Sequence, residues 1–193
     1  MVSPTDPNEV RLTGENSFIR LHTEANGPMT TRASHWRVLL SPGGPGHVLY
    51  LKSDATDDQV RIYSDNIALA RWLQDEIESF LFPEFADQSI QVIDAVFSRD
   101  GNAMTFWTET VESDEDTIAL TWYDFGEPFV INVPPGAVEG RNLGVYSCFV
   151  PARRAQLTLN GVVASGQPLP EMRGDRTTST ACLAWSETWV RPY

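Results

Sequence analysis

Glu187 is the residue whose neighbours in the sequence most clearly suggest chemistry. It stands in the run 180–190, and if that run is a strand, Trp185, Glu187 and Trp189 point to the same side. When that side is internal, the carboxyl group loses solvation and its pKa rises toward neutrality. A carboxyl group of this kind is a usable general acid or base. The alternative is a carboxylate at the rim of a site, between two half-exposed indole rings.

Asp94 raises the same question in the segment 89–98. It interrupts an apolar stripe, and the opposite face of the segment is nearly as apolar. A strand with two apolar faces is typical of the middle of a sheet, where a carboxylate needs a partner. The candidate partners are Arg37, His35 and a backbone donor. Two roles for Asp94 stay open: a structural ion pair or cap, and proton transfer with Arg37 or His35 as the electrostatic partner.

Several aromatic side chains lie in segments that are also expected to be strands, and together they could line a pocket. Threonine and glutamate alternate with the rings in the run 103–111, which suits a pocket for a partly apolar ligand. Core packing is the alternative. The candidate ligand-binding residues are Trp107, Trp122, Tyr123, Trp185 and Trp189.

Other kinds of site receive little support from the sequence. His22, His35 and His47 lack the spacing typical of metal ligands, and no Gly-x-Ser-x-Gly motif marks a nucleophilic serine. The acidic run 112–116 lacks the spacing of a calcium loop. We therefore expect no metal and no cofactor, although the three histidines could still meet in space. Four arginines could bind an anionic group of a ligand or pair with nearby acids: Arg153, Arg154, Arg173 and Arg176.

One amphipathic helix is predicted at about residues 65–82. Its apolar residues recur at steps of three and four, and its charged residues, Glu78 among them, mostly fall on other faces. Ser64 or Asp65 can cap its start, because a short side-chain oxygen accepts from the first free N–H groups. Pro83 ends the helix, because its ring clashes with the preceding turn and it has no N–H to donate.

Almost every other segment alternates with a period of two, which predicts about ten or more short strands. Tight hairpin turns are predicted at 99–102, 124–128 and 160–161, and the Pro-Gly segment 41–46 is predicted to join two strands. Such spacing favours a mostly β fold, an antiparallel β-barrel or β-sandwich, with the helix over one mouth or one face. The arrangement resembles lipocalin-like barrels in general architecture, which does not fix a function.

The composition indicates one core and an acidic surface. The chain has 193 residues, 41% of them hydrophobic, which fits a single β-rich domain (1–193) in which residues 1–9 are expected to be flexible. The formal net charge of −12 would repel nucleic acids and anionic membranes, so neither is an expected partner. The N-terminal residues do not resemble a signal peptide, and Cys148 and Cys182 are expected to be buried thiols. Both observations favour a cytoplasmic protein.

These observations lead to two hypotheses. The first is a small-molecule enzyme or binder with an aromatic-lined pocket inside the barrel or sandwich. Its chemistry would be cofactor-independent acid–base catalysis, such as an isomerisation, hydration or cyclisation, with Glu187 and Asp94 transferring protons. The second is a non-catalytic interaction module or accessory subunit that binds a protein partner through an aromatic patch.

The two hypotheses differ in where they place the tryptophans. Indole rings enclosed around a cavity favour the first, and a flat, solvent-facing patch favours the second. The sequence leaves open whether the chain forms a homo-oligomer.

Overall fold

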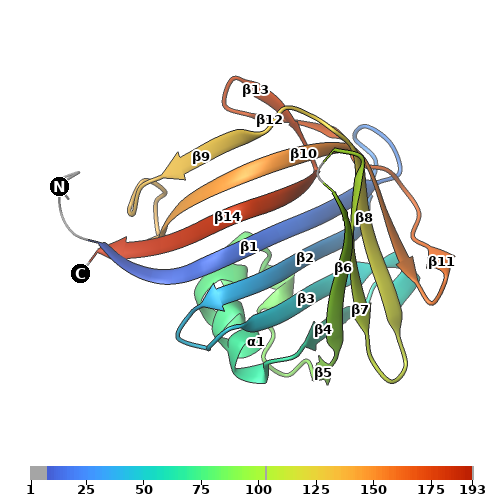
Figure 1. Cartoon of the computed structure of the whole chain (residues 1–193), viewed down its shortest axis with the longest axis horizontal. Coiled ribbons are helices and arrows are strands. Elements are labelled where there is room, and N and C mark those ends of the chain that lie inside the picture. Colours follow the sequence, from blue (N-terminus) through green and yellow to red (C-terminus); the bar gives the residue numbers. More distant parts are fainter. Residues whose placement is uncertain (1–7, 103, 193) are drawn as a thin grey trace.

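Strands with alternating apolar residues pair into one long sheet that curls into a nearly closed barrel (Figure 1). The computed structural model describes residues 8–102 and 104–192. The expectation that residues 1–9 are flexible therefore lies largely outside the described residues, and Asn8 and Glu9 already belong to the first strand. The strands of the first half are β1 (Asn8–His22), β2 (Met29–Leu40), β3 (Gly46–Ser53), β4 (Val60–Ser64) and β5 (Val92–Asp94).

The second half completes the sheet and adds a small separate hairpin. Its strands are β6 (Val96–Asn102), β7 (Phe106–Glu112), β8 (Thr117–Phe125), β9 (Phe129–Val133), β10 (Gly144–Leu159), β11 (Val162–Val163), β12 (Pro170–Arg173), β13 (Arg176–Ser179) and β14 (Ala181–Pro192). Strands β12 and β13 pair with each other and not with the main sheet.

The strand order explains why the barrel nearly closes. The main path is β5-β4-β3-β2-β1-β14-β10-β8-β7-β6, and β9 and β11 also pair with β10. Its two end strands, β5 and β6, are consecutive in the sequence with only Ala95 between them. The chain itself therefore brings the two edges of the sheet together, which limits the exposed strand edge. The prediction of a mostly β barrel or sandwich with one helix is confirmed, and of the two alternatives the structure is a nearly closed barrel.

The predicted turns have different outcomes: the segment 41–46 joins the antiparallel pair β2 and β3 as predicted, the turn predicted at 99–102 is displaced, and the hairpin predicted at 124–128 is wrong. The Asp-Gly pair at 100–101 lies within β6, which pairs with β7 up to Asn102 and Phe106, so the turn comes later in the chain. Strands β8 and β9 do not pair with each other: both pair with successive parts of β10, which is long enough to serve both. Asn160 and Gly161 form the predicted turn between β10 and β11, both with positive φ.

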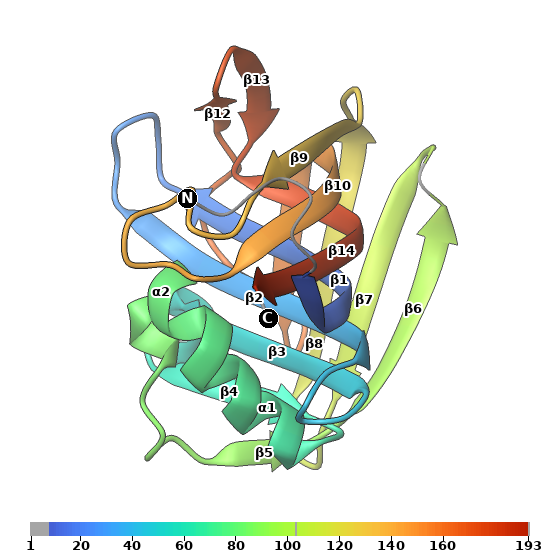
Figure 2. The same cartoon turned by 90° about the vertical axis from the view of Figure 1, so that its left-hand side faces the viewer.

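The helix lies against one face of the sheet, on the outside of the barrel (Figure 2). It runs without a break as α1 (Ile67–Leu73), the π-helical segment η2 (Gln74–Glu78) and α2 (Ser79–Leu81). A short 3-10 helix, η3 (Pro83–Phe85), follows it, and another, η1 (Asp54–Thr56), lies between β3 and β4. The cap is Asn66, rather than Ser64 or Asp65, because the Asn66 side chain accepts the bond from the Leu69 N–H. Pro83 follows the last helical turn, as predicted.

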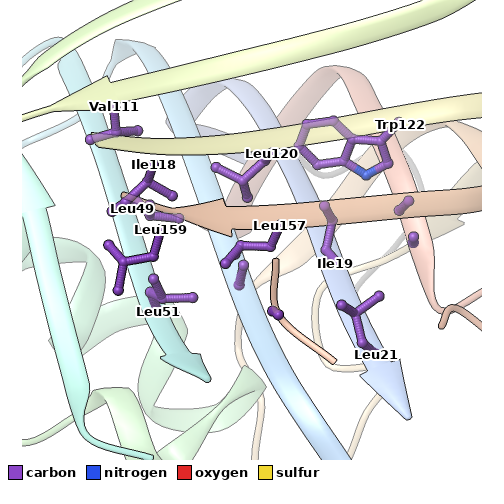
Figure 3. Close-up of a cluster of buried hydrophobic side chains, with 14 of the residues drawn as sticks. Ile19, Leu21, Leu49, Leu51, Val111, Ile118, Leu120, Trp122, Leu157 and Leu159 are labelled. Carbon is purple, nitrogen blue, oxygen red and sulfur yellow. The ribbon is translucent and has the colours of Figure 1, made fainter. Parts of the chain in front are cut away.

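The two largest of three apolar clusters among the described residues lie on opposite faces of the sheet. Inside the barrel, leucine, isoleucine and valine side chains from several strands form one cluster with Trp122, which is fully buried (Figure 3). Outside the barrel, Trp36 and Tyr50 of the sheet pack with Leu69 and Leu73 of the helix. The Tyr50 hydroxyl donates to the Ala70 carbonyl at 2.6 Å and fixes the helix to β3. The helix thus builds a second core on the outer face, and the candidate site lies at one end of it.

Candidate functional site

A pocket of about 330 Å³ opens on the outer face of the sheet, beside the C-terminal end of the helix. Its floor comes from β1, β9, β10 and β14, and α2 and the residue after it form one wall. The apolar lining residues are Phe18, Leu81, Phe82, Ile131, Val133, Val145, Phe149 and Trp189. The polar lining residues are Asn16, Arg20, Arg141, Arg173 and Glu187. The pocket thus combines an apolar wall with a small group of charged side chains, which is the usual composition of a ligand site.

Glu187 faces this pocket because β14 contains a bulge. Ser186 has a φ of 65°. At this residue β14 shifts register against both of its neighbouring strands, β10 and β1. One extra residue in a strand reverses the alternation of the residues that follow. Trp185 therefore packs against the core inside the barrel, while Glu187 and Trp189 lie on the outer face. The prediction that Trp185, Glu187 and Trp189 share one face is wrong for Trp185.

The carboxyl group of Glu187 is buried but hydrogen-bonded. The residue is 3% exposed, and the Trp189 indole N–H donates to its Oε1 at 2.6 Å. Burial raises the pKa of Glu187 to about 7, against the smaller opposing effects of hydrogen bonds from Trp189 and Ser147 and of the Arg173 and Arg141 charges. Near neutral pH the group is therefore present in both its acid and its base form, as a proton-transfer group requires.

Arg141 brings a positive charge into the same space. Its guanidinium carbon lies 5.0 Å from the centre of the Trp189 ring and 5.3 Å from that of Phe80. Its Nε donates to the Leu143 carbonyl at 2.8 Å, while its Nη2 is buried and has no hydrogen-bond partner within the described part of the chain. Burial lowers the pKa of the Arg141 guanidinium, so this cation is poorly solvated.

The other two arginines of the pocket share one acid. Arg20 contacts Glu171 at 2.6 Å, and Arg173 contacts the same carboxylate oxygen at 3.5 Å. Arg173 also lies over the rings of Phe149 and Phe18, at 5.2 Å and 5.5 Å from their centres. The hairpin of β12 and β13 therefore brings a positive charge to the far side of the pocket.

Glu78 is a second buried carboxyl group, next to the pocket in the layer between helix and sheet. It is 0% exposed, and its Oε1 accepts from Ser34 Oγ at 2.7 Å and from Trp36 Nε1 at 2.6 Å. Its Oε2 has no partner among the described residues. Burial raises the pKa of Glu78 to about 7, and the nearby charge of Glu187 acts in the same direction.

The prediction that Glu78 lies on a polar face of the helix is wrong. The π-helical turn that contains it and the four-residue step from Gln74, which is also buried, place it on the side that faces the sheet. The sequence carried one signal of this, because Ala70, Gln74 and Glu78 follow at steps of four, next to the apolar stripe.

Three of the predicted ligand-binding tryptophans lie on the inner side of the sheet instead. Trp122 is fully buried there and donates its Nε1–H to the Phe18 carbonyl at 3.1 Å. Trp107 and Trp185 pack edge to face with ring centres 5.3 Å apart. The Trp107 indole N–H donates to Oε1 of Glu109 at 2.8 Å, and burial raises the pKa of that carboxyl group. The structure thus brings these three rings together, apart from Glu187 and Trp189.

His35 and Arg37 lie on the inner side of β2 and do not reach Glu187. His35 is buried against the ring of Phe97, its Nε2 has no partner within the described residues, and burial lowers its pKa to about 3. It is therefore neutral at physiological pH. Arg37 is half-buried and pairs with Glu15 at 3.3 Å.

Asp94 and Tyr123 also lie away from the pocket. Asp94 is exposed on the end strand β5, so the prediction that it sits in a central strand and needs a buried partner is wrong. Four strands of the sheet path separate β5 from β14, which carries Glu187. Tyr123 lies under the guanidinium of Arg154, 4.8 Å from its ring centre. The predicted pair of proton-transfer groups, Glu187 and Asp94, is therefore not one site.

Within residues 8–102 and 104–192, no three His, Cys, Asp or Glu side chains are grouped so that they could hold a metal ion. His35 and His47 both pack against Phe97, with ring centres 5.8 Å and 5.1 Å from it. Cys148 and Cys182 are free thiols; Cys182 is buried as expected, whereas Cys148 is only half-buried.

A larger pocket of about 510 Å³ lies beside the β12–β13 hairpin. Its acidic lining residue, Glu127, is exposed, and its Arg153 is largely exposed and pairs with Asp124 at 3.3 Å. Exposed charges of this kind interact weakly. The smaller pocket is the better candidate, because a buried carboxyl group with a raised pKa lines it.

Comparisons with known proteins add no relative to this description: no family model, no curated protein and no solved structure matches the chain. None of the helices in the described part of the chain combines the length and the hydrophobicity needed to cross a membrane.

Proposed function

We propose that this protein binds a small, partly apolar molecule in the pocket beside the helix and exchanges a proton with it through Glu187. The observation that carries the proposal is the position of the Glu187 carboxyl group. It is almost fully buried, yet it lines a pocket of about 330 Å³. Burying an ionisable carboxyl group lowers the stability of the folded protein. Carboxyl groups with pKa values perturbed in this way cluster at functional sites.

The surroundings of Glu187 support acid–base chemistry. Its pKa of about 7 leaves it ready to accept or to donate a proton near neutral pH. As a carboxylate it would take a proton from an acidic C–H or O–H of the ligand, and as a carboxylic acid it would return one to another atom. Isomerisation, hydration and cyclisation all contain such a pair of steps. The Trp189 N–H donates to Oε1 of Glu187, and the carboxyl group lines the pocket, where a ligand could contact it.

The placement of the tryptophans favours this function over a flat protein-binding patch. Trp36 and Trp122 are fully buried, Trp189 is 2% exposed, and the remaining three indoles are half-buried. An exposed aromatic patch is the feature that the interaction hypothesis requires.

The experiment is deuterium exchange in D₂O, followed by NMR, on a panel of small oxo and unsaturated compounds. Each compound is supplied as the free carboxylic acid and as its primary amide. We expect the wild-type protein to introduce deuterium next to the carbonyl group or double bond of at least one compound, and the Glu187→Gln variant to have lost this activity.

Two further variants are the controls. Glu127→Gln removes an exposed carboxylate and should exchange deuterium at the wild-type rate. Val133→Trp fills the pocket from its floor on β9 and should abolish exchange although Glu187 is intact. Exchange that persists in Glu187→Gln, or a panel with no exchange at all, would refute the proposal.

A further inference from the structure

We infer that the ligand of this pocket is a compact amphipathic monocarboxylic acid whose carboxylate binds Arg141 and whose apolar part lies against the helix end. This inference rests on the proposed function of the pocket and names the class of molecule that it takes.

The first argument is the unused hydrogen-bonding capacity of Arg141. A guanidinium has five N–H donors in a planar fork that fits a carboxylate, and here Nε is used by the Leu143 carbonyl. Nη2 is buried without a partner among the described residues, and none of their carboxylates lies within 4 Å of the group. The guanidinium that lines the pocket therefore has no neutralising partner among these residues, and a ligand carboxylate would supply one.

The second argument is the balance of charge in the pocket. Three arginines line it against a single acid, Glu187, although the chain as a whole has a net charge of −12. Arg20 and Arg173 already share Glu171, whereas Arg141 interacts with Glu187 only at longer range and has no carboxylate within 4 Å among the described residues. In its protonated form Glu187 carries no charge and does not repel a ligand carboxylate. One such carboxylate would then neutralise Arg141. The protonated Glu187 can then donate its own hydrogen bond to the ligand.

The third argument is the shape of the remaining wall. Besides its charged side chains, the pocket is lined by Leu81, Phe82, Ile131, Val133 and Val145, which offer no polar side-chain group. A volume of about 330 Å³ is at the small end of the range for ligand pockets. The molecule therefore has one anionic end and a short apolar body. A phosphate or a nucleotide fits less well, because a second negative charge and further polar groups would have to be buried against this wall.

The test compares trans-cinnamate with cinnamyl alcohol, which has the same apolar body and no charge, by isothermal titration calorimetry. The full-length protein is used at about pH 6, where the raised pKa of Glu187 leaves most of that group protonated. We expect the acid to bind at least about tenfold more tightly than the alcohol, as one charge-assisted hydrogen bond allows. In the Arg141→Gln variant this preference should disappear.

Two further variants separate charge from packing. Arg141→Lys keeps the positive charge and much of the stem that packs on Trp189, so it should keep part of the preference even if Arg141→Gln is unstable. Arg153→Gln removes an exposed arginine from the other pocket and should bind both compounds as the wild type does.

The outcomes distinguish this inference from the proposed function. Equal binding of acid and alcohol, or a preference that survives in Arg141→Gln, overturns the assignment of a carboxylate to Arg141. Failure of both compounds to bind also overturns the inferred ligand class. In each case the proposed function is judged separately by deuterium exchange, where an active amide of the panel would support Glu187 chemistry on a neutral molecule.

Discussion

The protein should lose stability as the pH rises toward neutrality, and replacing Glu78 by glutamine should make this loss smaller. Glu78 is fully buried in the layer between helix and sheet, and its pKa is raised from 4.5 to about 7. The folded protein therefore holds a proton at pH values where the unfolded chain has released it. Stability then falls as the pH rises from about 4.5 to about 7, and this contribution stays constant above and below that window.

The magnitude follows from the size of the shift. Each pKa unit corresponds to about 1.4 kcal/mol, so a shift from 4.5 to about 7 corresponds to roughly 3 kcal/mol across the window. Glutamine keeps the oxygen that accepts from Ser34 and Trp36, and it does not titrate. Relative to the wild type, Glu78→Gln should therefore gain roughly 3 kcal/mol between about pH 4.5 and about pH 8. Glu187 keeps its own share of the pH dependence, so the slope is reduced and not abolished.

The assay is urea unfolding followed by tryptophan fluorescence at a series of pH values. Glu76→Gln is the matched control, because it removes a carboxylate from the same helical segment but outside the fully buried layer. Its stability should follow the wild-type pH dependence. If the curves of Glu78→Gln and wild type run parallel across the whole pH range, the burial of an ionisable Glu78 is not what sets the pH dependence, and the reasoning fails.

Three other substitutions test the core, the cap and the buried histidine. Trp122→Phe leaves the Phe18 carbonyl without its donor inside the barrel and opens a small void, so it should lower the free energy of unfolding by about 2 kcal/mol in urea titrations. Asn66→Ala removes the acceptor for the Leu69 N–H and should cost about 1 kcal/mol; an unchanged melting temperature would contradict the role of Asn66 as the cap. His35→Leu should reduce acid denaturation, because burial lowers the pKa of His35 from 6.5 to about 3 and its stabilising effect is lost as the pH falls through that window. Equal acid unfolding midpoints of wild type and His35→Leu would exclude this explanation.

The helix and most of the strands could be predicted because their signals are local. The apolar steps from Ile67 onward and the Pro83 stop depend on residues within one or two turns, and the structure confirms both. The turn at Asn160 and Gly161 is equally local, because both residues tolerate positive φ.

The failed predictions concern the pairing of strands and the side to which a residue points. Strands β8 and β9 were expected to form a hairpin, but β10 is long enough to pair with both, and no local pattern reveals which partner wins. Asp94 was expected in a central strand, yet its strand lies at the end of the sheet path. Such outcomes depend on register and on contacts between segments far apart in the sequence.

The candidate site divides in the same way. The sequence by itself identified Glu187 and Trp189 as a carboxyl group next to an indole ring, and it identified Arg173 as a possible anion-binding group. Only the tertiary structure placed Glu187 outside the barrel, because one bulge at Ser186 reverses the alternation of the strand. It alone brought Arg141 to the same pocket, since a loop residue is positioned by long-range packing and not by a periodic pattern. Composition and periodicity determine the elements; the register between distant strands decides which of their side chains meet.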